Sequence, residues 1–193
     1  MGRHKEFDRE QALHKAMEVF WSRGFGAASI EDLVEHMGIN RQSIYDTFGD
    51  KHALYLQALD RYREVEGRRL IELLERPGSV KKSLHQLFAE VVDRAVADPK
   101  HRGCFMGNAT SELAGRCKET AARTCDNMTT MEDAFYRALR RGKQQGEITG
   151  GQDLLATARF LHCTLQGLVL MAKARRDRKV LNDVARVTLS VIE

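Results

Sequence analysis

The sequence predicts an all-α fold of about nine helices, with a small N-terminal domain followed by a larger helical domain. Three observations lead to this expectation. The 193 residues include only two prolines, Pro77 and Pro99. Long stretches repeat apolar residues at the spacing of an amphipathic helix. Ser, Asn or Gly stands at the ends of several of these stretches, where helices are capped. We place the domain boundary between residues 50 and 51, giving domains 1–50 and 51–193.

The first expected helix covers residues 8–23. Its apolar residues recur on one face, and Gly24 follows directly as a stop signal. The core positions of this helix are Ala12, Leu13, Ala16, Met17, Val19 and Phe20.

Two short helices are expected next, joined by a tight turn. Ser29 and Asp32 resemble a capping box that starts a helix, and Gly38 ends it. Asn40 then caps a second short helix over residues 41–48. Two short helices with a Gly turn between them predict a helix-turn-helix, whose second helix enters the major groove of DNA.

The exposed chemistry of residues 41–48 favours this interpretation over an ordinary helical hairpin. Ile44 and Phe48 share one face and should be buried. The rest of the helix carries side chains that can bond to bases or phosphates, namely Arg41, Gln42, Ser43, Tyr45 and Thr47.

Roughly the first 55 residues resemble the N-terminal signature of the TetR family of transcriptional repressors. The matching residues are Gly24-Phe25, Ser29-Ile30, Gly38-Ile39, Ser43-Ile44-Tyr45 with Phe48, and Lys51 with Leu54. The resemblance implies DNA contact by the positions of Arg41, Gln42, Ser43, Tyr45 and Thr47.

Side-chain chemistry divides these contacts. Arg41 and Gln42 suit the base edges of guanine and adenine, whereas Ser43 and Tyr45 suit phosphate, and Thr47 suits either. Lys51 and Ser29 are expected to hold phosphate together with nearby helix N-termini. The basic arm formed by Arg3, His4 and Lys5 is expected either to contact DNA or to be a disordered tail.

Charge is distributed unevenly along the chain. The net charge is +4, but residues 1–50 contain nine acidic and only six basic residues. An acidic DNA-binding domain predicts modest non-specific affinity and a strong dependence on salt.

The remaining helices are expected over residues 51–76, 80–97, 117–145, 153–175 and 180–192, with a short core helix near Asn108. The helix over 153–175 is apolar on more than one face, which calls for partners on two sides, and the helix over 180–192 adds further apolar residues. The resemblance implies that they pair with those of a second copy, forming a homodimer. The alternative is that they are buried within one chain.

Cys104 is the main sensor candidate. The stretch 101–110 resembles a Gly-Cys-hydrophobic-hydrophobic-x-Asn segment in a subset of TetR-type regulators, some of which sense electrophiles or oxidants through this cysteine. A helix N-terminus near His101 and Arg102 would favour the thiolate. The alternative is an inert cysteine or part of a pocket wall. His101 and Cys104 alone are too few ligands for a metal site.

Helical periodicity turns a second set of candidate residues inward, either into a ligand pocket or into plain core. They are Phe88, Phe105, Met128, Met131 and Phe135. The identity of the ligand does not follow from the sequence.

Several classes of function are disfavoured. We find no nucleotide-binding loop, metalloprotease motif or catalytic triad, and we expect neither a cofactor nor a metal. No apolar run looks long enough for a membrane span, and the four cysteines lack CxxC spacing, which together indicate a cytoplasmic protein.

We therefore expect a homodimeric regulator, most often a repressor, that is released from palindromic operator DNA by a small-molecule or thiol-directed inducer. The alternatives are a helical protein-interaction module and a cysteine-dependent enzyme.

Overall fold

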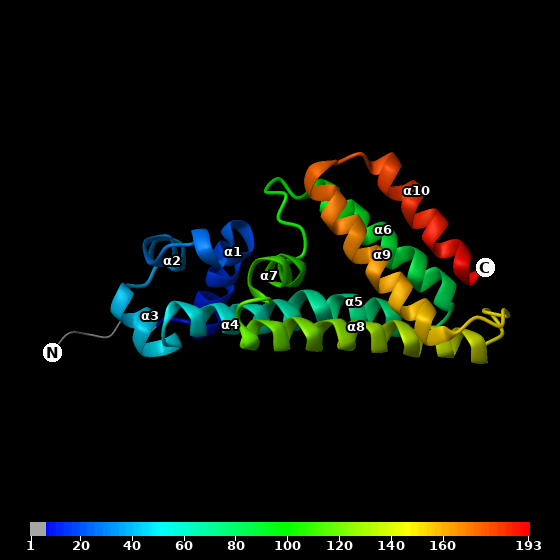
Figure 1. The fold of residues 1–193 in the computed structure, drawn as a ribbon, viewed down its shortest axis with the longest axis horizontal. Helices are drawn as coiled ribbons and strands as arrows, with labels where there is room; N and C mark the ends of the chain where they lie inside the picture. Colours follow the sequence, from blue (N-terminus) through cyan, green and yellow to red (C-terminus); the bar gives the residue numbers. More distant parts are fainter. Residues whose placement is uncertain (1–6) are drawn as a thin grey trace.

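The computed structural model describes residues 7–193, and every regular element in this range is helical (Figure 1). The expected all-α fold is confirmed. The basic arm of Arg3, His4 and Lys5 lies outside the described residues.

The N-terminal part consists of three helices: α1 (Arg9–Ala27), α2 (Ile30–Met37) and α3 (Arg41–Phe48). Ser29 and Asp32 form the expected capping box, and Asn40 caps α3. Gly38 adopts φ 73°, the left-handed conformation that glycine accommodates at a helix end.

One long helix links this part to the body. It comprises α4 (Lys51–Tyr62), a π-helical turn η1 (Arg63–Gly67) and α5 (Arg68–Glu75), and the backbone stays helical across both junctions. The expected single helix over 51–76 is thus present, with a π turn that periodicity did not reveal. It lies beside the longest helix, α8 (Lys118–Gln144) (Figure 1).

A second layer consists of α6 (Val80–Ala97), α9 (Leu154–Ala174) and α10 (Arg178–Leu189), which ends in the 3₁₀ turn η2 (Ser190–Ile192). The short helix α7 (Phe105–Leu113) lies between the N-terminal part and the body (Figure 1). With α4, η1 and α5 counted as one helix, residues 7–193 contain nine α-helices, as expected.

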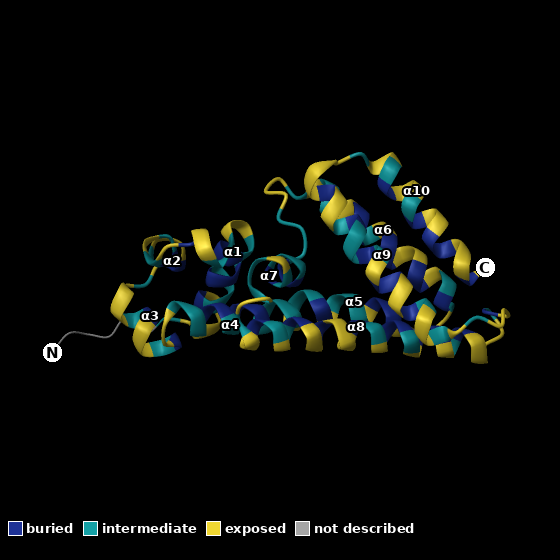
Figure 2. Cartoon of the chain, viewed as in Figure 1, coloured by how far each residue is buried: buried dark blue, intermediate teal, exposed yellow. Residues whose placement is uncertain are grey.

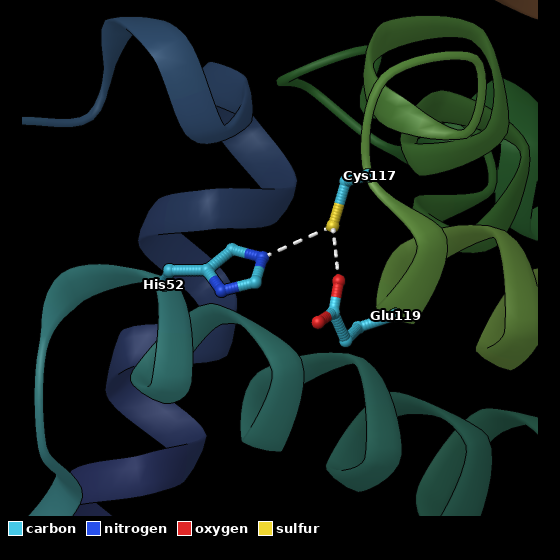
Figure 3. A group of neighbouring side chains, drawn as sticks. All are labelled: His52, Cys117 and Glu119. Atoms are coloured by element: carbon cyan, nitrogen blue, oxygen red, sulfur yellow. Dashed lines mark hydrogen bonds between the residues drawn. The ribbon is translucent and has the colours of Figure 1, made fainter.

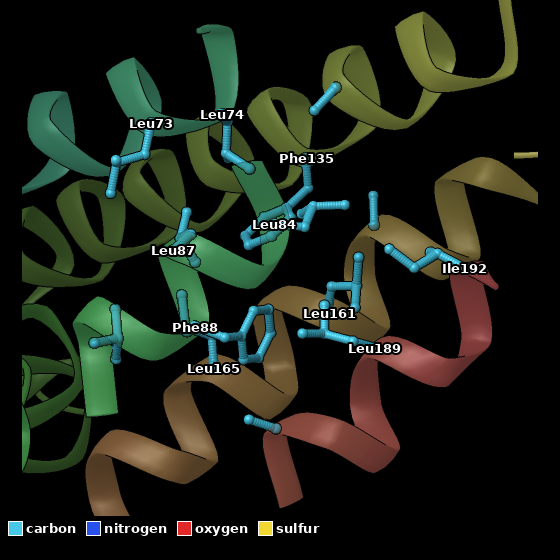
Figure 4. Packing of buried hydrophobic residues seen from close by; sticks show 14 of the residues in the cluster. Leu73, Leu74, Leu84, Leu87, Phe88, Phe135, Leu161, Leu165, Leu189 and Ile192 are labelled. Carbon is cyan, nitrogen blue, oxygen red and sulfur yellow. The ribbon is translucent and has the colours of Figure 1, made fainter. Parts of the chain in front are cut away.

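Two hydrophobic cores stabilise the fold. The body core joins α5, α6, α8, α9 and α10 (Figure 4), with Leu84, Phe135 and Leu161 fully buried at its centre. The N-terminal core joins α1 to α4, and it also includes Phe105, Met106 and Ala109 of α7. Helix α7 therefore belongs by packing to the N-terminal part, although in sequence it lies far beyond it.

Helix α9 corrects one expectation. It is long and apolar enough to cross a membrane by length and composition, with a mean hydropathy of 1.4, so the expectation of no such run was wrong. In this structure α9 packs against α6, α8 and α10. Its outer side remains exposed (Figure 2), where large apolar residues such as Phe160 and Leu170 face solvent.

Candidate nucleic-acid interface and adjoining cavity

Helix α3 is fixed on its inner side and free on its outer side. Ile44 and Phe48 are buried in the N-terminal core, and the Asn40 side chain accepts the backbone N–H of Ser43 at 2.8 Å. Arg41, Gln42 and Tyr45 are exposed, whereas Ser43 and Thr47 are half-buried. The structure thus brings all five predicted contact residues onto one short helix at the end of the molecule (Figure 1).

Acidic side chains already engage two of these residues. The Arg41 guanidinium forms an ion pair with Glu31 of α2, and the Gln42 amide donates to the Asp46 carboxylate at 2.7 Å. Exposed pairs of this kind contribute little to stability, about 0–1 kcal/mol each. A phosphate or base edge can therefore replace these acids at little cost.

Ser29 and Lys51 stand at two helix N-termini beside α3. The Ser29 hydroxyl accepts the backbone N–H of Asp32 at 3.0 Å, so its first role is to cap α2. The hydrogen bonds from Ser29 hold the pKa of Asp32 below its usual value. The Lys51 ammonium lies 4.6 Å from the centre of the Phe25 ring, in cation–π contact.

Helix α7 is attached to this domain by aromatic and polar contacts. The Phe105 ring makes edge contacts with Tyr55 and Tyr62 of α4, each at 5.7 Å between ring centres. At the other end of α7, the Glu112 carboxylate accepts the backbone N–H groups of Phe25 and Gly26 at 3.0 and 2.7 Å. A displacement of α7 would therefore be felt directly by α1 and α4.

A cavity of about 320 Å³ opens at the start of α7. Its walls come from α1, the long helix at the π turn, α6, the loop before α7, and α9. Trp21, Tyr62, Leu70, Val91, Leu165 and Val169 supply apolar surface, and Glu66, Arg69, Arg94, Asp98, Arg102 and Lys173 supply charge.

The charged walls leave an excess of positive charge. Glu66 is shared by Arg69 at 3.2 Å and Arg94 at 2.8 Å, Arg69 also pairs with Glu90, and Asp98 pairs with Arg102 at 3.3 Å. Among residues 7–193, the Lys173 ammonium donates to a neutral group, the Asn108 amide oxygen, at 2.9 Å and forms no ion pair. The cavity thus combines apolar walls with an excess of basic side chains.

Cys104 lies on the wall of this cavity and caps α7. Its sulfur accepts the backbone N–H of Gly107 at 3.5 Å, a weak bond from a helix N-terminus. Tyr62 is its neighbour, and burial together with the Cys104 sulfur raises the pKa of the Tyr62 hydroxyl well above its usual range. The hydroxyl therefore keeps its proton at neutral pH and can donate it to the sulfur.

The other predicted pocket residues lie elsewhere. Phe88, Met131 and Phe135 are buried in the body core, Phe105 is buried in the N-terminal core, and Met128 is 40% exposed. Of the predicted ligand residues, only Cys104 is on the cavity wall. The charged lining was missed because residues such as Arg69 and Glu66 have the alternating signs of a solvated helix face.

Both parts of the chain match known protein families. Residues 12–58 match the family described as bacterial regulatory proteins, tetR family. Residues 80–188 match the tetracyclin repressor-like C-terminal domain.

Individual relatives cover the whole chain. A transcriptional regulator of Bacillus subtilis (strain 168), YezE, itself uncharacterised, is 40% identical over 100% of both chains. The transcriptional repressor ComR of Escherichia coli (strain K12) is 31% identical over 97% of this chain and 90% of its own.

Among solved structures, a cysteine mutant of the TetR family regulator CifR was determined with a 26-base-pair double-stranded operator DNA. It superposes with a TM-score of 0.86 at 32% identity over 100% of both chains. The chain thus has the fold of a protein seen bound to its operator.

Proposed function

The chain belongs to the TetR family, whose members are DNA-binding transcriptional regulators rather than enzymes, and from this premise we propose a homodimeric repressor that leaves a palindromic operator when its cavity is occupied. One observation carries the proposal. Helix α7 is packed into the core of the DNA-binding domain, and its N-cap residue Cys104 borders the cavity. We expect the regulator to act in the cytoplasm, where its cysteines stay reduced.

DNA contact is assigned to the domain of residues 1–50 and the first turn of α4. Arg41 and Gln42 are proposed to reach base edges, while Ser43, Tyr45 and Thr47 fix the helix on the backbone or the adjoining base. Ser29 and Lys51 are proposed to hold flanking phosphates. The exposure of Arg41, Gln42 and Tyr45 supports this assignment.

The second copy is proposed to pair through α9 and α10. Large apolar side chains are exposed on these two helices and the η2 turn, and on no other part of the described body except Met128 of α8. They are Leu155, Phe160, Leu170, Met171, Val187 and Val191. Exposed apolar side chains gathered on neighbouring helices favour an interaction site there, and twofold pairing gives the two half-site readers that a palindrome needs.

The inducer is proposed to be a small molecule that reaches Cys104, either as a reversible ligand or by forming a bond with its thiolate. The charges around the cavity favour an anionic or carbonyl-bearing compound. To release DNA, the inducer must bind the DNA-incompetent state more tightly than the competent one, because equal affinity for both shifts no population.

The first experiment is operator binding measured by fluorescence anisotropy on the DNA upstream of the gene. The double variant Arg41→Ala/Tyr45→Ala should bind at least about 100-fold more weakly, because a bidentate base contact alone contributes about 1–3 kcal/mol. The matched control is Arg137→Ala, which removes an exposed, ion-paired arginine from α8. Equal affinity of the double variant and the control would refute the role of α3.

A second experiment tests the sensor. Operator binding is measured before and after treatment with a small α,β-unsaturated carbonyl compound, for wild type and Cys104→Ser. Release from DNA in wild type but not in the variant is the expected result. Equal release in both proteins would remove Cys104 from the mechanism and leave a reversible ligand as the inducer.

A further inference from the structure

His52, Cys117 and Glu119 meet at the far end of α7, away from the cavity (Figure 3). His52 is in the first turn of α4, Cys117 caps α8, and Glu119 is in the first turn of α8. The imidazole Nε2 lies 3.1 Å from the Cys117 sulfur, and the sulfur lies 3.4 Å from a Glu119 carboxylate oxygen. All three ligand atoms lie within 4.8 Å of one another.

These distances match a shared metal ion. With bonds of about 2.3 Å to sulfur and about 2.0–2.2 Å to nitrogen or oxygen, the ligand atoms of a tetrahedral Zn²⁺ site lie roughly 3.5 Å apart. The nitrogen-to-sulfur and sulfur-to-oxygen separations of 3.1 and 3.4 Å differ from that value by only a few tenths of an ångström. The exposed Glu119 leaves a side open to water as the fourth ligand.

Two further groups hold the sulfur in position. The Thr120 backbone N–H and hydroxyl both point to the Cys117 sulfur, at 3.4 and 3.2 Å. Thr120 is fully buried, so its side chain is held in place. The Cys117 sulfur is therefore fixed where it faces His52 and Glu119. The ligand types, one thiolate, one imidazole and one carboxylate, suit a borderline divalent ion.

We propose that His52, Cys117 and Glu119 bind a zinc-class divalent cation. On binding, the Cys117 thiol gives its proton to solvent and the sulfur forms a bond to the ion, while His52 binds through its unprotonated Nε2. The ion ties the DNA-binding end of the long helix, one residue beyond Lys51, to the start of α8. It acts on residues that are 65 positions apart in sequence, so no local spacing reveals it.

The test is titration of the chelator-treated full-length protein with Zn²⁺ in competition with a chromogenic chelator, and with Co²⁺ as a spectroscopic probe. Wild type should show a sulfur-to-cobalt charge-transfer band and bind one ion per chain. Cys117→Ser should lose the band and bind Zn²⁺ on the order of 100-fold more weakly, since one of three ligands is gone.

The serine substitution is chosen because serine is a good N-cap and should leave α8 folded. The matched control is Cys104→Ser, the same change at the cysteine that caps α7, and it should bind Co²⁺ and Zn²⁺ as wild type does. His52→Ala should also weaken binding about tenfold or more. Retention of the band in Cys117→Ser, or its loss in Cys104→Ser, would overturn the assignment.

Thermal unfolding gives an independent reading. At a hundredfold excess over its dissociation constant, an ion that binds only the folded chain should raise the Tm by roughly 5–10 °C. The rise should be absent from Cys117→Ser. Because neither measurement uses DNA, failure of the metal site and failure of the proposed repressor function can be told apart.

Discussion

The two ends of α7 carry the same local structure in different surroundings. Cys104 caps α7, and Cys117 caps α8 four residues after α7 ends, and each sulfur accepts a backbone N–H from the helix it caps. At the first end, the sulfur faces a partly apolar cavity beside Tyr62. At the second end, it faces His52 and Glu119.

A capping cysteine therefore takes its chemistry from the groups around it. A cysteine that opens onto a cavity can be reached by a small electrophile. A thiolate between an imidazole and a carboxylate can instead hold a cation. Helix α7 lies between the two cysteines in sequence and is packed into the N-terminal core.

The largest effect on stability should come from a substitution in α7 itself. Phe105 is buried and packs on Tyr55 and Tyr62, so Phe105→Ala should lower the free energy of unfolding by about 3–5 kcal/mol through lost burial and a cavity. Urea denaturation measures it. Met128→Ala, at an exposed position of α8, should change stability by less than about 0.5 kcal/mol. Similar losses in both variants would mean that α7 is not anchored as described.

The alkylation rates of Cys104 and Cys117 test the difference between the two cysteines directly. Brief alkylation with iodoacetamide, read by mass spectrometry, should be slowed at least about tenfold at Cys117 by Zn²⁺, because a coordinated thiolate is a poorer nucleophile than a free one. Cys104 should react at the same rate with or without the ion. Equal protection of both cysteines would show that zinc acts by general binding, and the contrast between the two ends would be lost.

A smaller effect is expected from the donor beside Cys104. Burial raises the pKa of the Tyr62 hydroxyl, which keeps its proton and faces the Cys104 sulfur as a donor. Tyr62→Phe should slow alkylation of Cys104 by a few fold, on the order of the 0.5–1.5 kcal/mol of one hydrogen bond. Alkylation of Cys117 is the internal control. An unchanged alkylation rate at Cys104 would mean that the hydroxyl does not assist the reaction of the sulfur.

The sequence predicted the elements of the fold more fully than the site. Capping signals at Ser29 and Asn40 predicted helix starts that the structure confirms, because such caps act within a few residues. The cavity and the His52–Cys117 contact depend on segments that meet only after folding. Periodicity placed Phe88 and Phe135 facing inward but could not distinguish a core from a pocket wall, since both are apolar and internal.

The smallest predicted effect concerns His162 of α9, whose neighbour Gln166 lines the cavity beside α7. Gln166 lines the cavity, and its amide nitrogen lies 3.3 Å from Nε2 of the buried His162. Burial lowers the pKa of His162, although Glu132 acts in the opposite direction. The neutral imidazole is therefore the folded form, and below about pH 6.5 the unfolded chain binds a proton that the folded chain does not.

The His162 contribution to the free energy of unfolding should consequently be fully present above about pH 6.5. It should fall as the pH drops towards the pKa of His162 in the folded chain, by at most about 1.4 kcal/mol per pH unit. His162→Leu should lack this part of the decline, and urea denaturation between about pH 7.5 and about pH 5.5, one unit either side of the usual histidine pKa, measures it. Carboxylates with lowered pKa values, such as Asp98, lose their contribution only at more acidic pH. If the free energy of unfolding falls with pH equally in wild type and variant, protonation of His162 does not destabilise the folded chain.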